Sequence, residues 1–102
     1  MNKTAKFIKT LDDWRSSAKL FELSEPMEYE LLDSNERRKT SFVIVSAVIA
    51  MFTGAETYIF PATKDGEAIN HLEMYGSFRG ELDHIQALNN AGYTVEGEID
   101  YV

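Results

Sequence analysis

The chain has 102 residues, no cysteine, a net charge of −7 at pH 7, and 44% hydrophobic and 12% aromatic residues. This composition predicts one folded domain over residues 1–102, and it excludes disulfide bonds, thiolate metal sites and a cysteine nucleophile. The negative charge argues against direct contact with nucleic-acid phosphates or anionic membranes.

Two features of the sequence bear on localisation. The first ten residues, MNKTAKFIKT, contain no apolar run of the kind found in secretory signal peptides. The longest apolar run, residues 42–52, is shorter than the about 20 residues that a membrane-spanning helix needs. We therefore expect no secretory signal peptide and no membrane-spanning helix.

The N-terminal segment shows weak helical spacing. Apolar residues recur at intervals of three and four over residues 4–14, and Thr4 is a candidate N-cap. This pattern favours a short N-terminal helix, with an unstructured tail as the alternative.

The middle and the end of the chain have strand character. Pro26 predicts a break between the first two strands, because proline disfavours helical and ladder geometry around it. The strongest candidate is apolar on both alternating faces, which predicts a central strand covered on both sides. The Asp65-Gly66 pair predicts a β-hairpin turn between the 56–62 strand and the strand that follows it. The predicted strands are 18–23, 27–31, 41–52, 56–62, a weaker one around 68–74, and 93–102.

One helix is predicted over residues 81–91, because Leu82, Ile85, Leu88 and Ala91 recur every three residues. Gly80 is its expected N-cap, and Gly92 is expected to end it in a left-handed conformation.

The order of these elements predicts an α+β fold, with an antiparallel sheet of about four to five strands and the helix on one face. Because one short helix covers only one face, the other face of the 42–52 strand must meet the N-terminal segment or a second copy of the chain. A homodimer is therefore one option.

The stretch MYGSFRGELDH, residues 74–84, is a candidate ligand site. Arg79 could bind an anion beside the helix start, and His84 could add an acid/base group. The alternative is a plain strand-to-helix turn, since the glycine spacing fits no phosphate-loop motif. His71 and His84 lack the spacing of metal ligands, so we expect no metal and no cofactor.

A second candidate site is acidic. Alternation over the last strand places three carboxylates on one exposed face, and two more lie on the 27–31 strand, which gives the set Glu28, Glu30, Glu96, Glu98 and Asp100. Such a face could bind a basic-surfaced host protein by mimicking nucleic-acid charge. The alternative is that these charges only keep an edge strand soluble.

The second half of the chain contains a series of short stretches: ETYIFPA at 56–62, GSFRG at 76–80, Asp83-His84, Ala87-Leu88 and AGY at 91–93. In this order they resemble a set of small uncharacterised proteins of bacteria and their phages. The chain departs from that pattern at Ala55, where proline would be expected, and at Asn70-His71, where an Asp-Trp pair would be expected. The resemblance implies a small cytoplasmic protein, with a phage origin as one option, and it implies no activity or site residues.

The leading hypothesis is a small acidic protein that is not an enzyme and acts by binding another protein, in a phage setting as an inhibitor of a host system. One alternative is a small-molecule, anion or enzymatic site at the 74–84 turn. The other is a homodimeric accessory protein.

Overall fold

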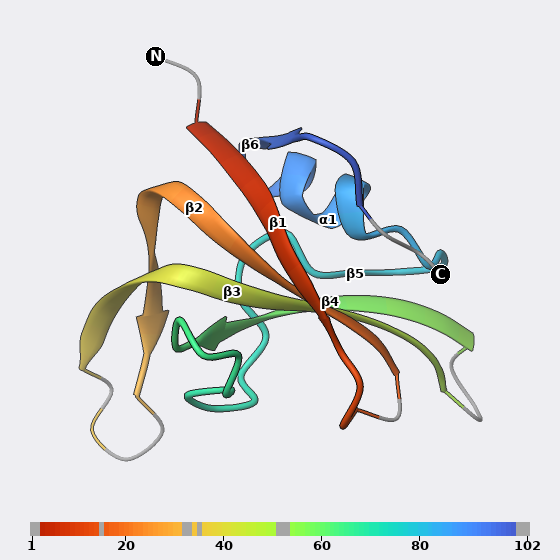
Figure 1. The fold of residues 1–102 in the computed structure, drawn as a ribbon. Coiled ribbons are helices and arrows are strands. Elements are labelled where there is room, and N and C mark those ends of the chain that lie inside the picture. Colours follow the sequence, from red (N-terminus) through yellow and green to blue (C-terminus); the bar gives the residue numbers. More distant parts are fainter. Residues whose placement is uncertain (1–2, 15, 32–33, 35, 51–53, 100–102) are drawn as a thin grey trace.

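The computed structural model of the protein describes residues 3–14, 16–31, 34, 36–50 and 54–99. Its elements follow each other along the chain as shown in Figure 1. They are β1 (Lys3–Leu11), β2 (Ser17–Glu30), β3 (Arg37–Ala50), β4 (Gly54–Ala62), β5 (Phe78–Arg79), α1 (His84–Asn90) and β6 (Tyr93–Glu96).

The described strands form one six-stranded sheet in the order β5-β4-β3-β2-β1-β6. Neighbouring strands are antiparallel except β1 and β6, which are parallel. The predicted combination of a sheet with one helix is confirmed, but the prediction of four to five antiparallel strands is wrong. The sheet is mixed because the chain crosses from one edge to the other through α1, and such a crossover returns β6 in the same direction as β1.

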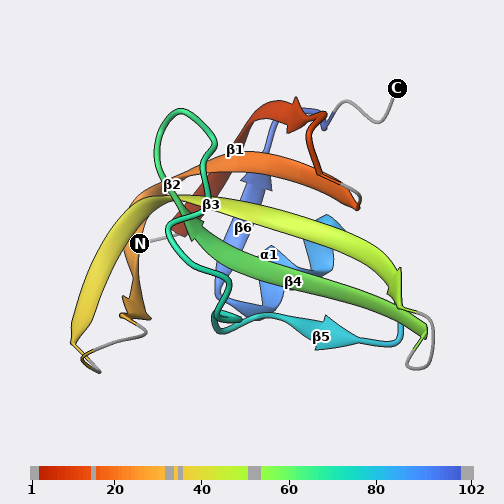
Figure 2. The ribbon, with the colours of Figure 1, turned by 90° about the horizontal axis from the view of Figure 1, so that it is seen from below.

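The sheet curls around α1, which lies between the two edge strands (Figures 1 and 2). The inner face and the helix enclose the larger hydrophobic core. Leu88 of α1 is fully buried there, together with Phe21, Val43 and Ile59 from three neighbouring strands. This burial fixes the helix against the sheet, since apolar area removed from water is the main stabilising contribution in a domain of this size.

The N-terminal segment is strand β1 rather than the predicted helix. Ala5 and Phe7 point to the inner core, and the register then shifts between Phe7 and Lys9, so that Leu11 packs on the opposite face. This β-bulge inserts one extra residue and breaks the alternation of two. The apolar spacing therefore resembled that of a helix.

Strand β2 is continuous where the sequence predicted two strands. The predicted break coincides with a register shift between Glu22 and Met27, and Pro26 lies within it. Beyond this irregularity β2 and β3 continue as a long hairpin that projects from the rest of the sheet (Figure 1).

The outer face of the sheet carries a second, smaller core. Its buried members are Leu11, Ala18, Leu20, Ile44 and Ala62. Trp14 from the N-terminal segment packs against them, as does Ala68, which lies beyond the turn that follows β4. Of the two alternatives predicted for this face, the N-terminal segment and a second copy of the chain, the structure shows the first, since Leu11 and Trp14 pack there.

Segment 63–77 replaces the weak strand predicted around residues 68–74. Its turn is present, with Gly66 at a φ of +93° and its amide donating to the Thr63 carbonyl. A single bridge then pairs Ala62 with Ala68. Further along, the Met74 amide donates to the Ile59 carbonyl of β4, so the segment follows the edge of the sheet without forming a regular ladder.

The helix is shorter than predicted and begins at His84, with Asp83 rather than Gly80 as its N-cap. The Asp83 carboxylate accepts a hydrogen bond from the Gln86 amide, which satisfies one of the open donors of the first turn. Residues 80–82 remain attached to β4, since the Gly80 amide donates to the Ala55 carbonyl. Gly92 ends the helix with a positive φ, as predicted.

The last strand ends at Glu96, earlier than predicted, and residues 100–102 of the predicted strand lie outside the described residues. Gly97 follows with a φ of +74°, a conformation that turns the chain away from the ladder. Among the described residues no helix is both long and apolar enough to cross a bilayer.

Candidate functional site

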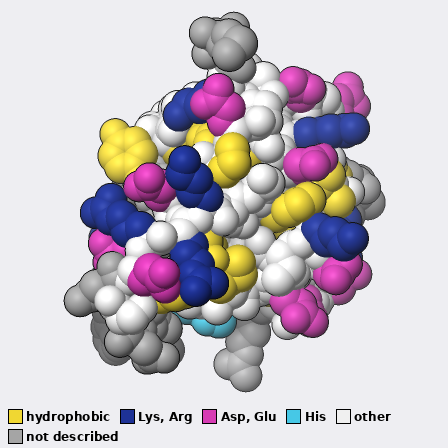
Figure 3. Space-filling model, turned by 90° about the vertical axis from the view of Figure 1, so that its left-hand side faces the viewer, with side chains coloured by type: hydrophobic (Ala, Val, Ile, Leu, Met, Phe, Trp, Pro, Cys, Tyr) yellow, Lys and Arg dark blue, Asp and Glu magenta, His cyan; other side chains and the backbone are white. Residues whose placement is uncertain are grey.

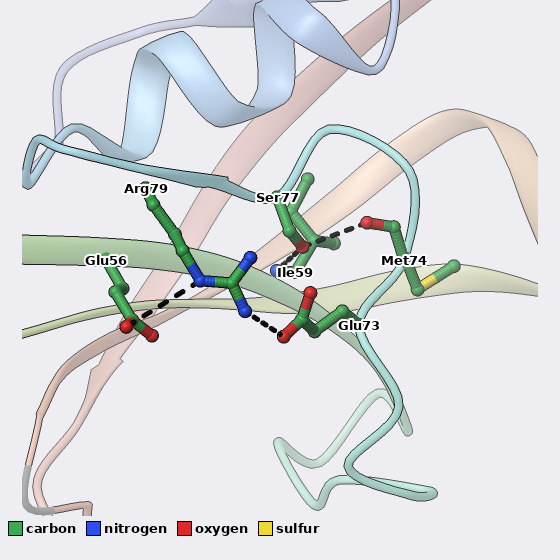
Figure 4. Close-up of polar contacts among 6 residues, drawn as sticks. All are labelled: Glu56, Ile59, Glu73, Met74, Ser77 and Arg79. Carbon is green, nitrogen blue, oxygen red and sulfur yellow. Dashed lines mark hydrogen bonds and ion pairs between the residues drawn. The ribbon is translucent and has the colours of Figure 1, made fainter. Parts of the chain in front are cut away.

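Arg79 lies on edge strand β5, opposite Glu56 of β4. Its Nε is 3.7 Å from Glu56 Oε1, and its Nη2 is 3.4 Å from Glu73 Oε1 (Figure 4). The guanidinium also lies 5.7 Å from the centre of the Tyr58 ring. Because Arg79 is placed between two carboxylates, an incoming anion would be repelled by both of them. This geometry does not favour the predicted anion site.

His84 is almost fully buried on the helix side of the sheet, and its Nε2 lies 2.7 Å from the Ser17 carbonyl. Burial lowers the pKa of His84 below its ordinary value, and the charge of Lys19 lowers it further, although the hydrogen bond to Ser17 acts in the opposite direction. Arg79 pairs on the outer face with Glu56, so the structure does not bring the two predicted ligand-binding residues together.

His71 belongs to an aromatic cluster on the outer face. Its ring lies 5.7 Å from the Trp14 ring and 5.5 Å from the Phe60 ring. In the described part of the chain, no three side chains of the metal-binding types are grouped as ligands. The two histidines therefore have separate structural surroundings.

The predicted acidic residues of β2 are partly neutralised. The Arg37 guanidinium lies 3.5 Å from the Glu28 carboxylate and 3.6 Å from the Glu30 carboxylate. In register, Glu28 also faces Lys39 of β3. On the side of the molecule that carries this hairpin, acidic and basic side chains alternate (Figure 3).

Glu96 and Glu98, two of the three carboxylates predicted at the end of the chain, do not lie on one continuous strand face. Glu96 ends β6, where it aligns with Lys6 of β1, and Glu98 follows the turn at Gly97. Asp100 lies outside the described residues. Lys6 is also the register partner of Glu22 on β2, so Glu96 lies level with Glu22. Glu28 and Glu30 lie further along β2, in the hairpin. Glu96 thus lies apart from Glu28 and Glu30, which share Arg37 as their ion-pair partner.

Sequence reasoning missed a denser acidic region, which we call the acidic hollow. It has a volume of about 470 Å³ and is lined by the side chains of Asp12, Asp13, Asp65 and Glu67, with Lys9 as its basic residue. The first two follow β1, and the other two lie in the turn after β4. This turn reaches β1 because Gly66 packs against Leu11, where an added Cβ would lie 2.9 Å from a Leu11 methyl group.

A second hollow separates the β2–β3 hairpin from segment 63–77, and we call it the hairpin hollow. It has a volume of about 350 Å³ and is lined by Glu28, Tyr29, Glu30, Arg37, Leu72, Glu73, Met74 and Tyr75. The hydrogen bond from the Asn70 side-chain amide to the Glu30 carbonyl, 3.0 Å long, connects the two walls. The only sequence signal for this hollow was the alternation of Glu28, Tyr29 and Glu30, which does not indicate what lies opposite.

Comparison with known proteins gives no matching family model, no matching curated protein and no matching solved structure. The resemblance to small bacterial and phage proteins therefore stays a prediction.

Proposed function

We propose that this protein acts without catalysis, by binding another protein that has a basic surface. The observation that supports the proposal is an excess of accessible negative charge. Nine carboxylates are exposed and form no ion pair within the described part of the chain: Asp12, Asp13, Glu22, Glu25, Asp65, Glu67, Glu81, Glu96 and Glu98. Such unpaired charges steer a basic partner toward the protein and repel acidic ones.

The acidic hollow is the best candidate for the main contact. The lining of the acidic hollow contains four carboxylates and one basic residue, Lys9, whereas the lining of the hairpin hollow contains three carboxylates and one basic residue, Arg37. We therefore move the centre of the proposed interface from the carboxylates of β2 and β6 to this hollow. A partner that normally holds nucleic acid would bind here in place of a phosphate backbone.

The biological setting is a proposal of its own. The resemblance to small proteins of bacteria and their phages supports a cytoplasmic protein, and in a phage it supports an inhibitor of a host system. A homodimeric accessory protein is less well supported, because Leu11, Trp14 and Ala68 already pack on the outer sheet face.

The test compares the native chain with a neutralised variant, Asp12→Asn, Asp13→Asn, Asp65→Asn and Glu67→Gln. Each chain is immobilised and exposed to nuclease-treated bacterial lysate, and any protein retained in stoichiometric amount is purified and titrated at two salt concentrations. We expect the affinity to fall as the salt concentration rises and binding to be lost in the neutralised variant. If the partner is a nucleic-acid-binding protein, duplex DNA should compete with the native chain for it.

The control is a second variant, Glu22→Gln, Glu25→Gln and Glu81→Gln, which removes three exposed unpaired carboxylates elsewhere. This control should retain most of the affinity. Binding that does not respond to salt or to either variant would contradict the proposal, as would the absence of any retained protein.

A further inference from the structure

We infer that the hairpin hollow receives an arginine side chain of the partner protein. This inference rests on the proposed function and names a contact within it. The hollow combines three acidic residues, two tyrosines and an apolar floor, and no side chain of the described residues fills its volume of about 350 Å³.

The charges of the hollow favour a cation. Its lining contains the carboxylates of Glu28, Glu30 and Glu73 and one basic residue, Arg37. All three carboxylates are about half exposed, and their ion pairs with arginine have lengths of 3.4 to 3.6 Å. Pairs of this kind are weak and readily exchanged, because water screens them and both side chains remain accessible. An incoming guanidinium can therefore share or replace them.

The aromatic and apolar walls favour arginine in particular. Tyr75 is 80% exposed and therefore offers ring surface to a planar cation, whereas Tyr29 is half-buried and packs against the larger hydrophobic core. Met74 is buried at 6% exposure and Leu72 is 38% exposed, and these two can contact the aliphatic part of the incoming side chain. A small anion would meet three carboxylates against the single positive charge of Arg37, so the balance of charge in the lining disfavours it.

The protein already binds one arginine of its own in the same way. Arg79 lies between Glu56 and Glu73 and over the Tyr58 ring, as Figure 4 shows for its two ion pairs. The hairpin hollow offers the same combination of two or more carboxylates with a tyrosine ring, with Glu73 common to both. The local chemistry that holds Arg79 is thus available to a guanidinium from outside.

The hollow also leaves room for the chain that carries the arginine. A neighbouring hollow of about 570 Å³ shares Glu73, Met74 and Tyr75 with it and extends to Asn90 at the end of α1. Tyr75, with its exposed side chain, therefore belongs to the lining of both depressions. A short extended peptide can place its arginine in the hairpin hollow and its neighbouring residues across Tyr75.

The test uses three capped tripeptides, Gly-Arg-Gly, Gly-Lys-Gly and Gly-citrulline-Gly, titrated into the full chain while the Met74 methyl signal is followed by NMR. We expect the arginine peptide to bind about fivefold more tightly than the citrulline peptide, because citrulline has the same shape but no charge. We expect a smaller advantage over lysine, which lacks the planar group. Tyr75→Ala and Glu73→Gln should each weaken the arginine peptide about fivefold, and Glu81→Gln should not change it.

Equal affinity for arginine and citrulline would overturn the inference, and so would a shift of the Met74 signal that persists in both variants. The proposed function fails separately. A partner that is retained by the acidic hollow but is unaffected by Tyr75→Ala and Glu73→Gln would overturn this inference and leave the proposed function intact. Specific binding of the arginine peptide without any salt-sensitive protein partner would overturn the proposed function and leave the arginine-binding hollow intact.

Discussion

Helix α1 and segment 63–77 both cover the sheet, but different forces hold them there. The helix contributes Ala87 and Leu88 to the inner core, where both are fully buried. The segment buries Met74, but it is attached mainly through hydrogen bonds, and it exposes Leu72 and Tyr75. Because the segment is attached through hydrogen bonds, several of its side chains remain available for contact with other molecules. The acidic hollow and the hairpin hollow both adjoin this segment, whereas the main core adjoins the helix.

Of the substitutions that test this difference between helix and segment, Leu88→Ala is expected to lower stability most. Removing a fully buried leucine side chain should lower the free energy of unfolding by about 2–5 kcal/mol, because both apolar burial and packing are lost. The matched change on the segment, Leu72→Ala, should cost less than about 1 kcal/mol, since that side chain is 38% exposed. Urea unfolding of the two variants measures the difference, and similar losses would contradict the proposed division between the two covers.

A second substitution tests the place where the segment approaches the helix. Gly76 has a φ of +107°, and a Cβ there would lie 2.6 Å from the Ala87 carbonyl oxygen. Gly76→Ala should therefore lower stability by about 2–4 kcal/mol, from backbone strain together with overpacking.

The control is Gly80→Ala, because Gly80 also has a positive φ but its Cβ would meet no atom within 4 Å. It should show the strain contribution alone. If thermal unfolding gives equal losses for the two variants, then the close contact between segment and helix is not important for stability.

A third substitution removes a hydrogen-bonding group that attaches the segment to the sheet. The Ser77 hydroxyl accepts from the Ile59 amide at 2.9 Å and donates to the Met74 carbonyl at 2.9 Å (Figure 4). Ser77→Ala should lower stability by about 1–2 kcal/mol, because it leaves the strand amide without its partner.

The matched control for this change is Ser41→Ala on β3, a half-buried serine whose side chain has no hydrogen bond within the described residues. Amide hydrogen exchange provides the specific measurement. The Ile59 amide should exchange faster in Ser77→Ala and at an unchanged rate in Ser41→Ala. Unchanged protection of Ile59 in both would show that the hydroxyl is dispensable.

The smallest expected effect is the pH dependence of stability that comes from His84, the first residue of α1. Because the folded-state pKa of His84 is lowered, the unfolded chain binds a proton more readily than the folded chain does. The contribution of His84 to stability is therefore complete above its ordinary pKa of about 6.5 and decreases as the pH falls below that value. Urea unfolding at pH 7 and pH 5 should show a smaller loss in His84→Gln than in the native chain, and an equal loss would contradict this assignment.

The sequence was sufficient to predict that a sheet is combined with one helix and that a turn lies at Gly66, because each depends on a local pattern. The number of strands and the parallel pair were not predicted. Strand β1 was missed because its bulge between Phe7 and Lys9 interrupts the alternation. The end of β6 was missed because apolar alternation continues past Gly97, although the glycine turns the backbone. In each case one local irregularity outweighed a regular pattern.

The candidate site could be predicted much less well than the fold. Arg79 and His84 are close in sequence, but β5 and α1 direct them to opposite faces of the sheet. Conversely, Asp12 and Asp65 are distant in sequence, and the packing of Gly66 against Leu11 brings their turns together. Composition thus predicted the excess of acidic residues, whereas strand register determines where they gather.

The parallel pair of β1 and β6 has a consequence for how the protein forms. It joins Lys3 to Tyr93, two residues separated by almost the whole chain. Contacts of such long range form slowly, because a large loop must close before any interaction compensates for the lost entropy. During synthesis residues 3–6 of β1 therefore have no strand partner on this edge until β6 has formed. In that interval the nascent chain is most exposed to aggregation and to chaperones that recognise open strand edges.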